Sequence, residues 1–163
     1  SNGMLLGGTT VAPGTGGVTK ATDSSELFLM DANTHEVRWR GAPVPGAKTI
    51  TDLMVGTDGL VYGLADSVDL FVFNPNNRQV VSVNRFSKDL GPSVYAQGTR
   101  AFVKGADGSI YVLLYNGIGK VDAKAHTVSR VVSSPVRITV GGAAANGRIY
   151  FGSNNHLYSW KAQ

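Results

Sequence analysis

Three segments of this chain can be aligned with one another. Each is an apolar run that ends in Asp or Asn. A short polar turn follows, and then a second strand-like run that begins at Val. The segments are residues 27–37, 70–80 and 119–128. A unit that cannot bury its own apolar face must stack on copies of itself, so an internal repeat constrains the fold more than any other pattern.

The spacing of the repeats indicates the architecture. Asp31, Asn74 and Asp122, which end the three apolar runs, lie 43 and 48 residues apart. A four-stranded blade of a β-propeller has about this length. The sequence therefore predicts an all-β protein built from four-stranded antiparallel blades.

Composition supports this class and excludes others. The 163 residues suit one domain, and 21 glycines with only 16% charged residues are typical of a turn-rich all-β protein. No apolar run approaches membrane-spanning length, so we expect no membrane span. The net charge of +4 is spread along the chain, which excludes nucleic acid as the expected partner. The absence of cysteine excludes disulfides and thiolate chemistry.

Short hairpin turns mark the first two strands of the last three blades. Asp58-Gly59, Asp107-Gly108 and Asn146-Gly147 occupy equivalent places, and these residues tolerate the positive φ of a tight hairpin. The second and third strands read as almost continuously apolar, whereas the fourth alternates. We therefore expect blades that are covered on both faces, with outer strands partly exposed to solvent.

The two ends are incomplete blades. Residues 3–8 align with 59–64, so the first blade begins at its second strand. The last blade has the predicted strands 137–144, 148–152 and 156–160 but no fourth strand. We expect about four blades, two complete and two partial, in a single segment over residues 1–163. Ser1-Asn2 is typical of residues left after tag removal, and no signal peptide follows. The segment would be the C-terminal part of a larger propeller, or would be completed by a second copy. Self-association or missing blades of the same propeller are thus expected partners.

Two sequence segments resemble known repeats. Residues 58–63 (Asp-Gly-Leu-Val-Tyr-Gly) and 70–75 (Leu-Phe-Val-Phe-Asn-Pro) resemble bacterial propeller repeats of the YVTN, quinoprotein-like (PQQ-like) and streptogramin-lyase-like families. The resemblance implies a β-propeller with a secreted or periplasmic location. Asn74 stands where these repeats usually have Asp. No quinone, calcium or lyase site matches residue by residue, so no cofactor is expected.

The histidines are the residues most easily over-interpreted. His35 and His126 occupy the same place in the turn before the fourth strand, where the second blade has Arg78. We interpret both as solvated turn residues. His156 lies in a different loop, but metal binding or acid–base catalysis there would need convergent partners that the sequence does not supply. No metal site is predicted.

One rim of the propeller is the predicted binding site. It is built from the loops between second and third strands and from the connections between blades. Bases, amides and a tyrosine on this rim could hold a glycan or a small anionic ligand, although ordinary polar loops would look the same. The candidate ligand-binding residues are Arg85, Lys88, Tyr115, Asn116, Arg137, Asn154, Asn155 and His156.

Three functions remain open. The leading hypothesis is a non-catalytic propeller module for ligand binding, including carbohydrate, or for protein assembly. The alternative is part of a propeller lyase or hydrolase that acts on polysaccharide and whose missing blades carry further catalytic groups. The weakest is a remnant of a quinoprotein-like oxidoreductase, because Trp39 and Trp160 are the only tryptophans.

Overall fold

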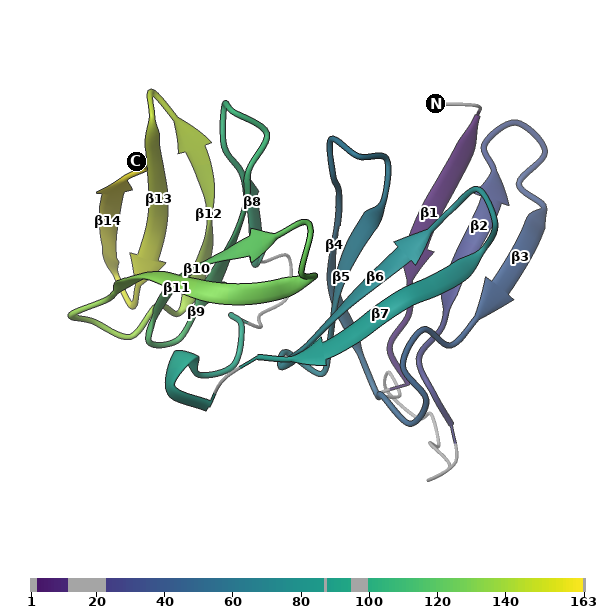
Figure 1. Ribbon diagram of the computed structural model, residues 1–163, viewed down its shortest axis with the longest axis horizontal. Helices are drawn as coiled ribbons and strands as arrows, with labels where there is room; N and C mark the ends of the chain where they lie inside the picture. The colour runs from purple at the N-terminus through teal and green to yellow at the C-terminus, as the bar shows by residue number, and fades with distance from the viewer. Residues whose placement is uncertain (1–2, 12–22, 87, 95–99, 163) are drawn as a thin grey trace.

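The chain folds into four antiparallel sheets that follow one another in sequence order (Figure 1). The computed structural model describes residues 3–11, 23–86, 88–94 and 100–162. The first sheet has the strand order β1-β2-β3, with β1 (Met4–Gly8), β2 (Leu27–Asp31) and β3 (Val37–Gly41). The second contains β4 (Ile50–Val55), β5 (Val61–Ala65), β6 (Asp69–Asn74) and β7 (Gln79–Arg85).

The other two sheets repeat this arrangement. The third contains β8 (Phe102–Lys104), β9 (Ile110–Leu114), β10 (Gly117–Asp122) and β11 (Thr127–Ser133). The fourth contains β12 (Val140–Ala145), β13 (Arg148–Ser153) and β14 (His156–Lys161). The predicted two complete blades between two partial ones are therefore confirmed, in a partial β-propeller. The clearest boundary error is β12, which starts at Val140 rather than at Arg137.

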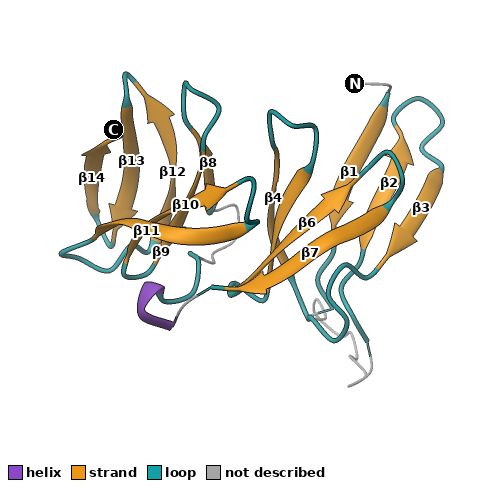
Figure 2. Ribbon diagram, viewed as in Figure 1, coloured by secondary structure: helices purple, strands orange, loops and turns teal. Residues whose placement is uncertain are grey.

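Strands and turns make up nearly all of the described structure (Figure 2). Within the described residues the only helix is the short 3-10 helix η1 (Lys88–Leu90), which lies in the connection between the second and third sheets. None of the described helices is long and apolar enough to cross a bilayer.

Each blade has two faces, and the packing between neighbouring blades forms the core. We call the face toward the next blade in sequence the front face, and the face toward the preceding blade the rear face. Leu70 on the front face of the second blade packs in one cluster with Ile110 on the rear face of the third. Every residue of β5 and β9 is buried, as expected for sheets that are covered on both sides. The outer strands β7 and β11 are mostly exposed.

The turns differ in one detail from the prediction. Asn146 and Gly147 both have positive φ, of 50° and 69°, as a tight hairpin requires. In the Asp-Gly turns only the glycine has positive φ, 78° at Gly59. Asp58 instead accepts a hydrogen bond on Oδ1 from the backbone N–H of Leu60, at 3.0 Å. Asp is therefore selected here for its side-chain acceptor and not for its tolerance of positive φ.

A carboxylate ties two neighbouring inner strands together. Asp52 on β4 accepts a hydrogen bond on Oδ2 from the backbone N–H of Phe102 on β8 (2.8 Å), and its Oδ1 accepts one from the N–H of Leu53 (2.8 Å). The side chain is half-buried, and this burial raises its pKa, although the two N–H donors oppose the shift.

Asp52 predicts a specific pH dependence. Because its pKa is raised in the folded state, the folded protein takes up a proton more readily than the unfolded chain. Lowering the pH from neutrality toward the ordinary value of 3.8 therefore adds stability at this residue. The free energy of unfolding of the wild type, measured by urea denaturation relative to Asp52→Asn, should rise over that interval. A difference that stays constant or falls would contradict the assignment.

A glycine pair provides a matched test of packing. A Cβ at Gly63 would collide with the ring of Phe71, and a Cβ at Gly7 with the ring of Phe28. Phe71 is fully buried between two blades, whereas Phe28 is only partly buried on the rear face of the first blade. Gly63→Ala should therefore lower the free energy of unfolding by about 1–3 kcal/mol. Gly7→Ala should cost clearly less, because the ring of Phe28 has room to move. Equal losses in chemical denaturation would refute this explanation.

Candidate functional site

The front face of the last blade is exposed where the other blades are buried. Leu157, near the start of β14, occupies the position that Leu70 has in the second blade and Ile118 in the third. The three residues pair with Gly152, Leu64 and Leu113, respectively, on the preceding strand. Leu70 and Ile118 are 0% and 1% exposed beneath the next blade, whereas Leu157 is 76% exposed. An apolar side chain is thus kept at a position that no part of the described chain covers.

The rear face of the first blade shows the same contrast. Leu5 on β1 pairs with Met30, as Val61 pairs with Phe73 in the second blade. Val61 is 2% exposed, but Leu5 is 50% exposed. The remaining apolar side chains on this face are half-buried or exposed, and they are Phe28, Met30 and Val37.

We call these two surfaces the end faces. The front end face carries the apolar residues Leu157, Tyr150 and Val140 beside Arg148, Ser159 and Lys161. The rear end face carries the apolar residues Leu5, Phe28, Met30 and Val37 beside Glu26 and Arg40. Figure 1 shows the sheets that carry them at opposite ends of the molecule. Exposed apolar surface of this kind marks an interaction site more often than a lone exposed leucine does.

The predicted rim contains a groove of about 520 Å³. The guanidinium of Arg137 lies over the ring of Tyr115, with its Cζ 4.0 Å from the ring centroid. The groove joins the turn between β9 and β10 to the connections on either side of the third blade. Its lining residues are Gly91, Pro92, Tyr115, Asn116, Ser134, Pro135, Val136 and Arg137. A stacked guanidinium with free donors can hold a carboxylate or sulfate group.

Three of the eight predicted site residues, Tyr115, Asn116 and Arg137, line this groove together. Asn116 is also structural, because its side-chain Nδ2 donates a hydrogen bond to the backbone oxygen of Asp89 at 3.1 Å. The backbone N–H of Ile138 donates to the oxygen of Tyr115 at 3.2 Å, which fixes the position of Arg137.

The other five predicted residues lie outside the groove. Arg85 forms a bidentate ion pair with Asp69, with both N···O distances at 2.8 Å, and Asp69 is 8% exposed. Lys88 is exposed on η1. The remaining three form the exposed turn into β14, and they are Asn154, Asn155 and His156. The rim is thus a series of separate polar groups, of which only the Tyr115–Arg137 region forms a pocket.

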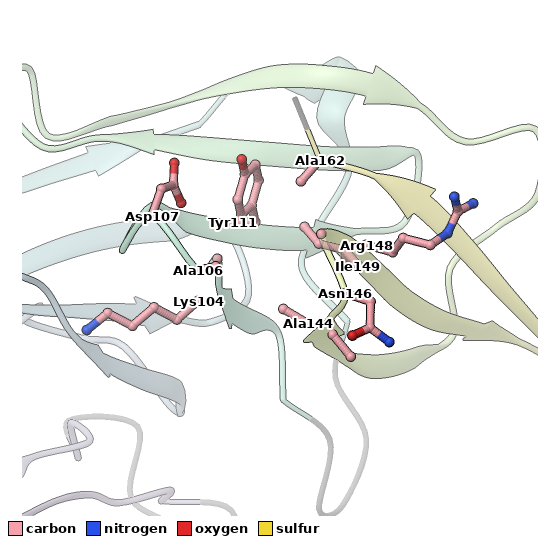
Figure 3. Close-up of a pocket in the computed structure, with 12 residues that line it drawn as sticks. Lys104, Ala106, Asp107, Tyr111, Ala144, Asn146, Arg148, Ile149 and Ala162 are labelled. Atoms are coloured by element: carbon pink, nitrogen blue, oxygen red, sulfur yellow. The ribbon is translucent and has the colours of Figure 1, made fainter.

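The opposite face carries two pockets between neighbouring hairpin turns. The larger, about 500 Å³, lies between the third and fourth blades and is drawn in Figure 3. The smaller, about 220 Å³, lies between the second and third blades. In the smaller pocket the hydroxyl of Tyr62 donates to Asp58 at 2.6 Å, and His126 lies edge-on to its ring. Burial and this hydrogen bond raise the pKa of Tyr62.

The prediction that His126 is a solvated turn residue is therefore only partly correct. It is half-buried against the neighbouring blade, whereas His35 and Arg78, at equivalent places, are exposed. All three have positive φ, between 55° and 60°, which supports the repeat alignment.

The larger pocket lacks a catalytic arrangement. Its bases, Lys104 and Arg148, lie at opposite ends in Figure 3 and donate to Val55 O and Ser159 Oγ, each at 2.9 Å. Asp107 accepts a hydrogen bond from the hydroxyl of Ser109 at 2.6 Å. Over the described parts of the chain, no group of three His, Cys, Asp or Glu side chains could hold a metal ion.

Sequence reasoning predicted incomplete end blades that a second copy or further blades would complete, but it missed which apolar side chains are exposed there, and it missed the Tyr115–Arg137 stack. The stack joins residues far apart in sequence, so no local pattern marks it. The end faces did have a signal, because Leu157 repeats Leu70 and Leu5 repeats Val61 in the blade alignment. Whether these side chains are exposed depends on whether another blade packs against them, and the alignment does not show this.

Comparison with known proteins supports the fold alone. No protein-family model and no curated protein sequence matches this chain. Among solved structures, the β-propeller domain of Myceliophteria thermophila Cps50 (Swd1) superposes with a TM-score of 0.68 at 14% identity, over 99% of this chain and 48% of that one. Saccharomyces cerevisiae Sqt1 gives a TM-score of 0.63 at 14% identity, over 85% of this chain and 40% of Sqt1.

A third similar structure is an extracellular domain from B. thetaiotaomicron that is assigned to a one-component system. It gives a TM-score of 0.62 at 14% identity, over 83% of this chain and 19% of that chain. This chain therefore spans less than half the length of each of these three proteins. At this identity the likeness establishes a β-propeller fold and carries no activity with it.

Proposed function

We propose that this chain is a non-catalytic β-propeller module that serves protein assembly through its end faces. The observation that supports the proposal is the exposure of Leu157, at a position where the equivalent leucine and isoleucine are fully buried by the next blade. Covering such a surface removes apolar area from water, at about 25 cal/mol per Å². In this proposal the chain is either the C-terminal part of a larger propeller or is completed by another chain.

Two turn carboxylates support the non-catalytic part of the proposal, while Asp52, whose pKa is raised by burial, is held by the backbone N–H groups of Leu53 and Phe102. Asp31 and Asp122 accept hydrogen bonds from backbone N–H groups of their own turns, and these bonds lower their pKa values. A carboxylate with a lowered pKa stays ionised and is a poor general acid. The polysaccharide lyase or hydrolase alternative would need acids that these turns do not supply.

A second candidate function is binding of an acidic glycan at the rim groove. The specific observation in its favour is the Arg137 guanidinium stacked on Tyr115, because an aromatic ring and a cation can together hold a sugar carboxylate. A secreted or periplasmic location belongs to this proposal, and the resemblance to bacterial propeller repeats supports it.

Photo-crosslinking in the native cell tests the assembly proposal. A photoreactive amino acid in place of Leu157 should crosslink to protein, because this position would lie inside an interface. The matched control is Val131 on the outer strand β11, which is 40% exposed and belongs to neither end face. Crosslinks at position 157 that are no stronger than those at position 131 would refute the proposal, whatever the partner.

Calorimetric titration with an acidic oligosaccharide tests the rim groove. Binding should weaken as salt is raised and should fall several-fold in Arg137→Ala. Exposed charge pairs contribute only about 0–1 kcal/mol each, so we expect affinities no tighter than high micromolar. Arg78→Ala, an exposed arginine in a turn between third and fourth strands, is the control and should bind as the wild type does. Equal binding by all three proteins would place the site elsewhere.

A further inference from the structure

We propose that Tyr115 is the specificity-determining residue of the rim groove. Its ring holds the Arg137 guanidinium in one plane, so that the groove binds an anionic group of a sugar through two parallel hydrogen bonds. The inference rests on the glycan-binding function proposed above and goes further, because it names the residue that orients the cation and the group that the cation recognises. Such a group needs two acceptor oxygens, as a carboxylate or a sulfate ester has.

The rim groove is built from interior segments of the chain, and hydrogen bonds hold its walls together. The walls are the turn between β9 and β10 and the connections on either side of the third blade. On one side the N–H of Tyr115 donates to the oxygen of Pro92 at 2.9 Å. On the other side the N–H of Ser134 donates to the oxygen of Asn116 at 3.0 Å. The turn is thus fixed to both connections, and the site is preformed.

A comparison between blades shows that the Tyr115 side chain is free of the structural task of its repeat equivalent. Asp66 has this place in the second blade, where its N–H donates to the oxygen of Thr49 at 2.9 Å. The Asp66 carboxylate in turn accepts a hydrogen bond from the N–H of Thr49, at 2.9 Å. In the third blade the residue equivalent to Thr49 is Pro92, which has no N–H to donate. An aromatic ring replaces the carboxylate there, and a guanidinium lies over the ring.

Arg137 also differs from the arginines that stabilise the blades. Arg85 and Arg130 form ion pairs with Asp69 and Asp89, respectively, each with an N···O distance of 2.8 Å. Among the described residues, no carboxylate lies within ion-pair distance of Arg137. None of the residues that line the rim groove is acidic. The guanidinium can therefore donate to an anion that enters the groove.

Stacking decides where the donors of Arg137 point. All N–H groups of a guanidinium lie in its plane, and the ring of Tyr115 covers one face of that plane, with the Cζ 4.0 Å from the ring centroid. An anion is then best held at the edge of the guanidinium, where two N–H groups match two oxygens of one anionic group. A lysine ammonium would carry the same charge without this fork. The groove therefore recognises the geometry of the group as well as its charge.

The first test keeps the charge of the groove and removes the fork. Calorimetric titration uses an oligosaccharide of glucuronate units, its methyl ester, and a sulfated oligosaccharide of the same length. We expect at least one of the two anionic probes to bind and the ester not to bind. Arg137→Lys should lose affinity several-fold and bind within about two-fold of Arg137→Ala. The matched control Arg78→Lys, in an exposed turn outside the groove, should bind as the wild type does.

The second test changes the ring beneath the guanidinium. Tyr115→Phe keeps the ring face and should bind as the wild type does. Tyr115→Leu keeps an apolar side chain against the neighbouring core cluster but removes the stack, and its affinity should fall about two- to five-fold. Because Tyr115→Leu leaves the charge unchanged, its affinity should decline with salt as steeply as that of the wild type. In Arg137→Ala the decline should be shallower.

Two results would overturn the inference and leave glycan binding standing. They are wild-type affinity in Arg137→Lys and wild-type affinity in Tyr115→Leu. Thermal unfolding checks that each variant is folded. Arg137 is exposed, so Arg137→Lys should fold and decides the question if Tyr115→Leu does not.

An oligopeptide of glutamate separates the anionic group from the sugar that carries it. Tighter binding of this peptide, with the same dependence on Tyr115 and Arg137, would overturn the glycan function and leave the role of Tyr115 standing. A wild type that binds none of the anionic probes would overturn both.

Discussion

Apolar packing between the faces of neighbouring sheets is the interaction on which the rest of this structure depends. Each sheet is apolar on both sides, and β5 and β9 are buried at every residue. A blade has no core of its own, so its stability comes from the blades next to it. The second and third blades each have two such neighbours, whereas the first and last have one. Among the described residues, the end faces are the two blade faces without a covering neighbour.

The polar residues of the loops mainly hold this stack in register. Asp66 accepts hydrogen bonds from the backbone N–H groups of Lys48 and Thr49, at 2.8 and 2.9 Å, and so joins a blade-to-blade connection to a turn of the next blade. Asn116, which looks like a ligand-binding residue in the sequence, makes a similar bond to the connection before its blade, and Arg85 pairs with Asp69 on the adjacent strand of its own blade. A polar side chain on a propeller rim is therefore weak evidence for a ligand unless the structure also gives it a pocket.

The two kinds of candidate surface differ in what they could bind. The rim groove is small and charged, and its contribution to affinity would be screened by salt. The end faces combine apolar side chains with charged ones, which are Arg148 and Lys161 on the front and Glu26 and Arg40 on the rear. Exposed apolar side chains on a blade face suit a protein partner, while the Tyr115–Arg137 stack suits a small acidic ligand. One chain can carry both, because the two surfaces do not overlap.

The amino-acid sequence by itself determined the blades. The aligned runs ending at Asp31, Asn74 and Asp122, together with the glycine turns, predicted the strand order and the incomplete first and last sheets, because hairpins and alternating strands are local features. Tertiary structure decided what these residues contact. His126 is half-buried against Tyr62, Arg137 stacks on Tyr115, and Leu157 is exposed while Ile118 is not. The physical reason is that burial depends on the neighbour across the gap between two sheets, and a repeat gives equivalent residues the same strand position without giving them the same neighbour.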